Sequence, residues 1–287
     1  MGRIDYSKAH FETAAVHAAQ GRDPTWGAMQ PPIYLSATFG FETIDDVIAV
    51  KAGKRPGYAY TRASNPTNDI LEKKLAILSG GEAAAVTASG IGAVGATLVS
   101  FLKHGDHVVC SDGVYGGTDY IMRNNLPDMG IDVTFVDATN ASNIEAAITP
   151  ATKMIYFETP MNPSMRLVDI EAVVAIGKAH GIKVVVDCTF APPPIQYPLH
   201  LGVDLVVYST TKYINGHGDA LGGAVVGRKE DIAWIKTRGI SKVCGTPQNP
   251  FASYLTLRGI QTLYLRLRQQ SENAMAVARY LETLCPR

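Results

Sequence analysis

The chain has 287 residues, of which 46% are hydrophobic and 18% are charged, a balance typical of a globular protein with a well-filled core. Its 26 basic and 26 acidic residues cancel, and no Lys/Arg cluster stands out, so nucleic acid is not an expected partner. Four cysteines lie far apart without CxxC spacing, which argues against a zinc site or a disulfide framework and fits a reducing cytoplasm; they are Cys110, Cys188, Cys244 and Cys285.

The first sixty residues differ from the rest of the chain. They are irregular and contain four prolines, so we expect residues 1–60 to form an N-terminal arm rather than a domain. The opening segment Met1–Tyr6 lacks the apolar core of a signal peptide, which again favours a cytoplasmic protein.

Beyond the arm, apolar runs alternate with helix-patterned stretches. The runs predict strands at Ala83–Thr87, His107–Cys110, Asp132–Val136, Met154–Phe157, Lys183–Val186, Asp204–Val207 and Gly223–Val226. The stretches between them predict helices at Ile91–Lys103, Thr118–Leu126, Asn143–Ile148 and Asp169–His180. Near-continuous apolar strands separated by helices are typical of an α/β protein with a mostly parallel sheet covered on both faces.

Two further segments have a distinct pattern. Ala83–Leu102 carries no charge and is long enough to suggest a membrane span. Three glycines and several hydroxyl residues in its middle favour a strand, a loop and a helix instead, and we expect no contact with a membrane. From Gly259 to Leu284 a long amphipathic pattern predicts a helix.

The glycine-rich segment Ser89–Gly95 follows a predicted strand and opens a predicted helix. Its glycines satisfy GxGxxG, and Asp112 ends the next strand near the distance expected for a ribose-binding acid. A dinucleotide oxidoreductase is therefore one interpretation, and close helix–sheet packing is another. If the segment binds a ligand, its glycines expose backbone N–H groups at a helix N-terminus, where the phosphate of a dinucleotide or of another phosphate ester is stabilised.

Other candidate ligand contacts lie in loops. Tyr115 is followed by two glycines that leave room for a flat ring to stack on it. Tyr60 and Arg62 form a possible phosphate fork in the arm, although such a pair is equally common in a solvated segment. Asn162 follows a strand and could hydrogen-bond a phenolic oxygen, or it could simply make a turn with the next proline.

Asp187 and Lys212 are the most informative side chains. Asp187 ends an apolar strand, where a carboxylate is costly to bury unless it meets a cation. Lys212 follows another buried strand, and a partly desolvated lysine there can act as a nucleophile toward an aldehyde. The hydroxyls of Ser209 and Thr211 could bind a phosphate ester. An aldehyde that carries a phosphate and a protonated ring nitrogen describes pyridoxal 5'-phosphate (PLP). His217 lies near a carboxylate, but no second ligand has metal spacing, so no metal is expected.

At these positions the chain resembles the PLP-dependent enzymes of sulfur amino-acid metabolism (trans-sulfuration). The family includes methionine γ-lyase, cystathionine γ-lyase, cystathionine γ-synthase and the O-acyl-homoserine sulfhydrylases. The resemblance is carried by Tyr-Thr-Arg (60–62), Asn-Pro-Thr (65–67), Ala-Ser-Gly (88–90), Tyr-Gly-Gly-Thr (115–118), Glu-Thr-Pro-Met-Asn-Pro (158–163), Val-Asp (186–187), Ser-Thr-Thr-Lys-Tyr (209–213), Gly-His-Gly-Asp (216–219) and Leu-Arg-Gly (257–259).

The resemblance implies a role for each candidate. Lys212 would bond to the cofactor aldehyde and later take the Cα proton of the substrate, while Tyr115 would stack on the ring and protonate the leaving group. Asp187 would hold the ring nitrogen. The phosphate would be bound by Gly90, Ile91, Ser209 and Thr211, and from the neighbouring subunit by Tyr60 and Arg62. The active unit would then be a homodimer, usually paired into a homotetramer.

The resemblance also implies a type I aminotransferase-like fold with a PLP-binding domain at residues 61–258. Residues 259–287 would form a long helix leading to a small C-terminal domain that is largely absent. Methionine γ-elimination, giving methanethiol, 2-oxobutanoate and ammonia, is the expected reaction. A cystathionine γ-lyase or synthase, or a sulfhydrylase that performs γ-replacement, is the alternative. Two departures weaken the methionine assignment, because methionine γ-lyases usually carry Cys at Gly117 and Lys-Asp at Ser241–Lys242. A non-catalytic truncated subunit is a remote alternative.

Overall fold

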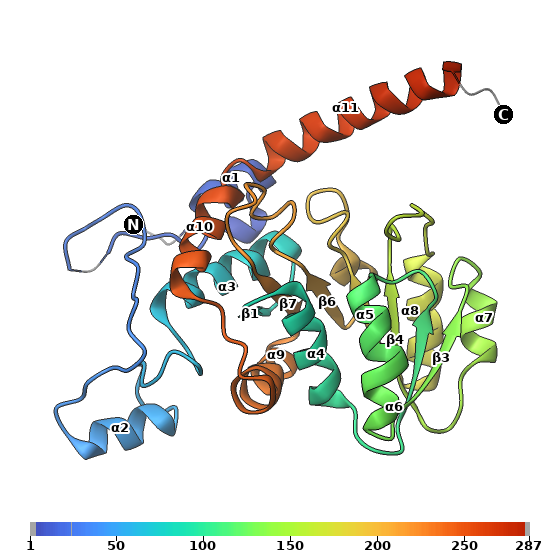
Figure 1. Ribbon diagram of the computed structural model, residues 1–287. Helices are drawn as coiled ribbons and strands as arrows, with labels where there is room; N and C mark the ends of the chain where they lie inside the picture. The colour runs from blue at the N-terminus through green and yellow to red at the C-terminus, as the bar shows by residue number, and fades with distance from the viewer. Residues whose placement is uncertain (1–3, 24, 285–287) are drawn as a thin grey trace.

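The computed structural model describes residues 4–23 and 25–284; residues 1–3 of the expected arm, Pro24, and residues 285–287 with Cys285 lie outside this description. One seven-stranded sheet forms the centre of the described chain, in the order β1-β7-β6-β5-β4-β2-β3 (Figure 1). The strands are β1 (Ala83–Thr87), β2 (His107–Ser111), β3 (Asp132–Val136), β4 (Thr152–Glu158), β5 (Lys183–Asp187), β6 (Leu205–Tyr208) and β7 (Gly223–Gly227).

The sheet is mostly parallel, as expected. Strands β3, β2, β4, β5 and β6 run parallel to one another, while β7 is antiparallel to both β6 and β1. Each predicted run overlaps one observed strand. The predicted α/β class is thus confirmed.

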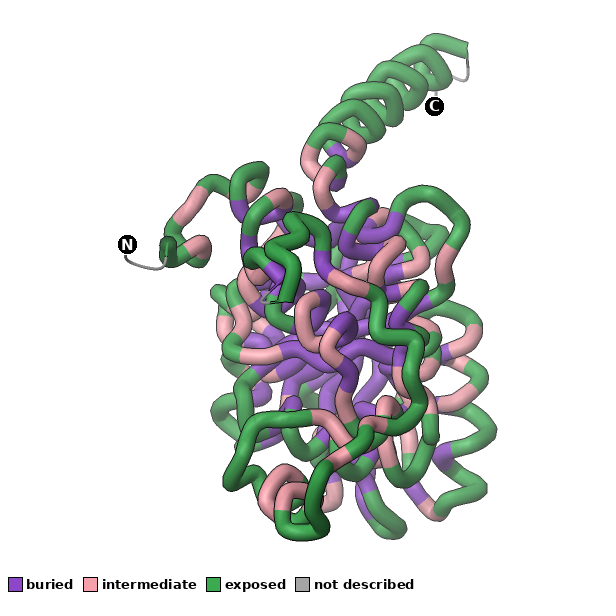
Figure 2. Tube along the Cα trace, turned by 90° about the vertical axis from the view of Figure 1, so that its left-hand side faces the viewer, coloured by how far each residue is buried: buried purple, intermediate pink, exposed green. Residues whose placement is uncertain are grey.

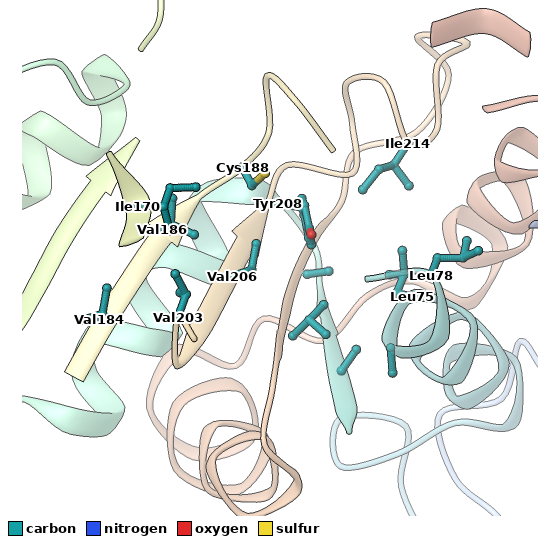
Figure 3. Packing of buried hydrophobic residues seen from close by; sticks show 14 of the residues in the cluster. Leu75, Leu78, Ile170, Val184, Val186, Cys188, Val203, Val206, Tyr208 and Ile214 are labelled. Carbon is teal, nitrogen blue, oxygen red and sulfur yellow. The ribbon is translucent and has the colours of Figure 1, made fainter. Parts of the chain in front are cut away.

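Helices cover both faces of the sheet, because alternate strand residues point to opposite sides. Val184 and Val186 pack in one hydrophobic cluster with helices α3 and α8 (Figure 3). Val185 packs in a second cluster, with α4. The buried residues concentrate in this central layer and the exposed ones surround it (Figure 2). The main helices are α3 (Pro66–Ser79), α4 (Gly90–Phe101), α5 (Gly116–Tyr120), α6 (Leu126–Asp128), α7 (Ala141–Ala146), α8 (Ile170–His180), α9 (Lys229–Trp234) and α10 (Pro250–Ile260).

Local sequence signals set several helix boundaries. The Ser89 hydroxyl accepts a hydrogen bond from Gly92 N at 3.1 Å and caps α4, and Asp169 caps α8 in the same way. The helix predicted at Thr118–Leu126 instead starts at Gly116 and passes through a π-helical stretch, η2 (Ile121–Asn125). A second π-helical stretch, η4 (Ile235–Cys244), packs against α4. Ala83–Leu102, whose lack of charge suggested a membrane span, is β1, a two-residue loop and the whole of α4. No helix within the described residues is both long and apolar enough to cross a membrane.

The structure differs from the predicted secondary structure in the arm and in the long C-terminal helix. The arm is not wholly irregular, because it contains a 3-10 turn (η1, Tyr6–Lys8) and the helices α1 (Phe11–His17) and α2 (Ile44–Lys51). The long C-terminal helix α11 (Leu263–Leu284) begins four residues later than expected, since α10 continues to Ile260. Only its first turns are buried, at Leu263 and Leu267, and the remainder projects from the body (Figures 1 and 2).

Candidate functional site

The predicted site residues meet at one edge of the sheet. Strands β4, β5 and β6 are parallel, so their carboxyl ends lie side by side, and Glu158 on β4 pairs in register with Asp187 on β5. A cavity of about 590 Å³ opens there. Its lining includes eight of the predicted residues: Gly90, Ile91, Tyr115, Asn162, Asp187, Ser209, Thr211 and Lys212.

Tyr60 and Arg62 lie elsewhere. Among the described residues they line two other hollows, formed with the arm and with the segments around Ser241 and Pro247. The Arg62 guanidinium lies 5.3 Å from the centre of the Tyr60 ring. Within one chain, therefore, these two side chains do not join the cavity that contains Lys212.

Lys212 sits in a tight turn directly after β6. Its N–H donates to Ser209 O at 3.2 Å, and its carbonyl accepts from Gly216 N at 2.7 Å. Arg266 at the base of α11 donates to the carbonyl of the next residue, Tyr213, at 2.8 Å. The lysine side chain is exposed within the open cavity rather than desolvated. Its backbone is fixed, and its amine remains accessible to a ligand.

Asp187 is a buried carboxylate with few compensating contacts. The side chain is 7% exposed, and its Oδ1 accepts a hydrogen bond from Thr189 N at 2.9 Å. Burial raises the pKa of Asp187 above its ordinary value, because the charged form loses solvation. Thr189, which the sequence analysis did not single out, also accepts from Ser209 N at 2.8 Å and so joins the ends of β5 and β6. A cation in the cavity would relieve the desolvation of Asp187.

The first two glycines of the GxGxxG segment have a packing role that the third lacks. A Cβ added at Gly90 would lie 2.6 Å from the Ser209 Cβ, and one at Gly92 would lie 2.8 Å from the Thr246 hydroxyl. A Cβ at Gly95 would meet nothing within 4 Å. Gly90 thus allows the N-terminus of α4 to approach the loop that carries Ser209.

The topology makes the dinucleotide interpretation wrong. That motif requires its strand and the next strand along the chain to form a parallel unit, but β1 pairs antiparallel with β7 and β2 lies between β4 and β3. Asp112, the expected ribose-binding acid, instead pairs with Arg166 at 2.9 Å.

An anion cradle nevertheless forms at the start of α4. The helix dipole and the first-turn N–H groups of Gly90 and Ile91 favour a negative group there, and the Ser209 side chain lies directly against Gly90. The Thr211 hydroxyl is already engaged, donating to Gly222 O at 3.1 Å and accepting from Gly222 N at 3.0 Å. Ser209 is therefore the better placed hydroxyl, and Thr211 would have to redirect its proton to donate to a phosphate.

Tyr115 and Asn162 are held by a carboxylate that the sequence analysis did not include among the candidates. Glu158 accepts from Tyr115 N at 2.7 Å through Oε2 and from Asn162 N at 3.2 Å through Oε1. Burial, and secondarily the charge of Asp187, raises the pKa of Glu158 to about 7. The sequence signal was available, because Glu158 ends an apolar strand just as Asp187 does.

Two further observations bear on the ligand. Thr118 lines the cavity, is 1% exposed, and has a hydroxyl without a partner within the described part of the chain. His217 makes a contact of 2.7 Å from Nδ1 to Asn215 O, and no metal-binding group of His, Cys, Asp and Glu occurs among residues 4–23 and 25–284. An accessible amine, a desolvated carboxylate that needs a cation, and an anion cradle together fit the aldehyde, ring nitrogen and phosphate of PLP.

Comparisons with known proteins agree with this fit. A family model described as Cys/Met metabolism PLP-dependent enzyme matches residues 12–285. An L-methionine gamma-lyase from Porphyromonas gingivalis is 43% identical over 283 residues, covering 98% of this chain and 71% of the relative. A putative cystathionine gamma-lyase 2 from Caenorhabditis elegans is 44% identical over 278 residues, covering 95% and 68%. The crystal structure of metB from Corynebacterium glutamicum superimposes with a TM-score of 0.91 at 37% identity, covering 99% of this chain and 71% of that one.

Proposed function

The chain belongs to the Cys/Met metabolism PLP-dependent enzyme family, and from that premise we propose that it eliminates the γ-substituent of a sulfur amino acid, with methionine as the favoured substrate. The supporting observation is the single cavity lined by Lys212, Asp187 and the N-terminus of α4. These groups match the three parts of PLP that a protein must hold.

The proposed binding roles follow from chemistry and position. Lys212 bonds to the aldehyde, and Asp187 gains a cationic partner at the ring nitrogen. Tyr115, whose side chain is 52% exposed at the cavity, stacks on the ring. Gly90, Ile91 and Ser209 bind the phosphate, with Thr211 if its hydroxyl turns, and Asn162 reaches the phenolic oxygen.

The proposed catalytic roles are proton transfers. Bound PLP supplies an electron sink for the charge that develops at Cα of the substrate. With the cofactor bound, the Lys212 amine would accept the Cα proton, because it lines the same cavity. Tyr115 donates a proton to the departing γ-substituent. A Cβ proton is also lost before the γ-substituent departs, and one water then hydrolyses the remaining unsaturated amine, so methionine and water give methanethiol, 2-oxobutanoate and ammonia.

We further propose that the active unit is a homodimer, paired into a homotetramer. Tyr60 and Arg62 lie outside the Lys212 cavity of their own chain, which supports a role at the phosphate of a neighbouring subunit. The free cysteines Cys110, Cys188 and Cys244 fit a reducing compartment, which supports the proposed cytoplasmic location.

A second candidate is γ-elimination of cystathionine, or γ-replacement on an O-acyl-homoserine. The observation that favours it is Gly117, where methionine γ-lyases usually carry Cys. A Cβ at Gly117 would lie 2.7 Å from Cε1 of Tyr115, so the absence of a side chain sets where the Tyr115 ring lies. A differently placed Tyr115 would meet a different leaving group.

One substrate panel separates the candidates. The purified chain with PLP is assayed for 2-oxobutanoate and thiol from methionine and from cystathionine, and for homocysteine from O-acetylhomoserine with sulfide. The proposal predicts the highest kcat/KM for methionine. A higher value for cystathionine, or product only when sulfide is supplied, would overturn the methionine assignment in favour of the second candidate.

A further inference from the structure

One buried carboxylate connects two loops that come from different parts of the sheet. Glu158 Oε2 accepts from the backbone N–H of Tyr115, which follows β2, and Oε1 accepts from the N–H of Asn162, which follows β4. Each oxygen therefore holds one loop. The distances, 2.7 and 3.2 Å, are those of normal hydrogen bonds, and bonds to a charged acceptor are stronger than neutral ones.

The surroundings make this arrangement specific. The Glu158 side chain is 3% exposed and lines the cavity. The titratable groups around it are Asp187 on the adjacent strand, Tyr156 on its own strand, and Lys212 and Tyr115 in the cavity lining. Two buried carboxylates side by side repel each other, so Glu158 is retained at an energetic cost that an apolar residue would avoid.

We propose that Glu158 is a positioning residue of the active site: by binding the Tyr115 and Asn162 amides with one carboxylate, it fixes the distance between the tyrosine that faces the ring and the amide that faces the phenolic oxygen. This inference rests on the proposed function. It assigns Glu158 no contact with the substrate. Glu158 acts through the two loops, and above all through Tyr115, whose hydroxyl must reach the γ-substituent.

The variant Glu158→Gln tests this role without changing the size of the side chain. An amide has one acceptor oxygen, and its NH₂ group would face a backbone N–H, so only one of the two loops can stay bound. Glu158→Asp keeps the charge but is one methylene shorter. Glu171→Gln is the matched control, because Glu171 is an exposed residue in the first turn of α8. Thermal unfolding establishes that each variant is folded.

The first readout needs no cofactor. In the wild-type chain without PLP, the backbone amide resonances of Tyr115 and Asn162 should shift together as pH is varied, with one shared midpoint near 7, the pKa of Glu158. The shared titration should disappear in Glu158→Gln and persist in Glu171→Gln. Independent titration of the two amides, or a titration that survives in Glu158→Gln, would overturn the proposal.

The second readout is a double-mutant cycle in the loaded enzyme. Glu158→Gln alone should lower kcat by about 10- to 100-fold, because a small misplacement of a catalytic group is that costly. In a Tyr115→Phe background the same change should lower kcat by less than about threefold, because coupled residues are not additive. Equal losses in both backgrounds would contradict a role exerted through Tyr115. Failure of the wild-type chain to bind PLP would overturn the proposed function instead, and the amide titration without cofactor would still decide the role of Glu158.

Discussion

Two regions of the molecule carry the predicted cofactor residues, and they hold them differently. At the sheet edge, Lys212, Asp187 and Gly90 line one cavity; Lys212 is held by hydrogen bonds within its turn, and Asp187 by its place in β5 between β4 and β6. In the arm, Tyr60 and Arg62 together line two hollows that are distinct from that cavity. The arm helix α2 buries no residue. The arm also exposes large apolar side chains, with Trp26 at 90%.

The difference shows what the topology of one chain can and cannot assemble. Parallel strands bring their carboxyl ends together, so residues distant in sequence meet at that edge without further help. The arm has no such constraint, and exposed apolar groups of this size are typical of interaction surfaces. Substitutions in the two regions should therefore differ in how far their effects depend on chain association.

The largest effect is expected at the sheet edge. Lys212→Ala should abolish the visible absorption of bound PLP and lower kcat about 1000-fold or more, since it removes both the covalent attachment and the base. Absorbance titration and steady-state kinetics measure these effects. Lys178→Ala, an exposed lysine on α8, is the control and should retain both properties. Visible absorption that persisted in Lys212→Ala would place the cofactor elsewhere.

Asp187→Asn should separate stability from cofactor binding. Because burial raises the pKa of Asp187, its favourable contribution to folding is complete below the ordinary value of 3.8 and is lost as pH rises through the folded-state pKa. Without PLP, the free energy of unfolding of the Asn variant at neutral pH should therefore exceed that of the wild type by about 1–3 kcal/mol. Its affinity for PLP should fall by about 30-fold or more, since it lacks the partner of the ring cation.

Asp128→Asn, an exposed carboxylate on α6, is the control for that experiment. Calorimetry without cofactor and absorbance titration with it give the two quantities. A variant that is both less stable and equally able to bind PLP would contradict the role of Asp187.

The glycine segment offers a matched pair at the same edge. Gly90→Ala should weaken PLP binding about 10-fold, because its Cβ would lie 2.6 Å from that of Ser209 and overpacking costs about 1–3 kcal/mol. Gly95→Ala should leave the affinity unchanged, since nothing lies within 4 Å of its Cβ. Equal effects of the two changes would argue against the close approach of α4 to Ser209.

The smallest effect is expected in the arm and should depend on concentration. Arg62→Ala should weaken PLP binding up to about fivefold, because an exposed charged contact contributes about 0.2–1 kcal/mol, at protein concentrations where chains associate. In dilute monomer it should have no effect. Arg22→Ala, also exposed in the arm, is the control. Absorbance titration beside sedimentation velocity tests this, and a loss that was independent of association would place Arg62 at the phosphate of its own chain.

The sequence predicted the strands well because their apolar runs are continuous and bounded by turn residues. It did not predict α3 or α10, although Asn65 and Asn249 cap them, because, apart from the long C-terminal helix, helices were expected only between the predicted strands, and these two lie before the first strand and after the last. It did not predict that β7 runs antiparallel, because an apolar run carries no direction. These features depend on long-range pairing rather than local pattern.

The same distinction applies to the site. The cavity contains the eight candidates that follow strands or open α4, because their place in the sheet follows from topology. Thr189 and Glu158 were not predicted, because their contacts join strands and loops that are distant in sequence, although Glu158 ends an apolar strand just as Asp187 does. The choice between a dinucleotide and PLP, and the catalytic roles of Lys212 and Tyr115, came from the family resemblance, because the spacing of the residues did not decide between these two cofactors.

Chemical trapping tests the central claim most directly. The wild-type chain is incubated with PLP, treated with borohydride to reduce any bond between a lysine and the cofactor aldehyde, digested and mapped by mass spectrometry. We predict that the cofactor's mass is attached to the peptide that contains Lys212. Attachment to another lysine, or no attachment with cofactor in excess, would contradict the account.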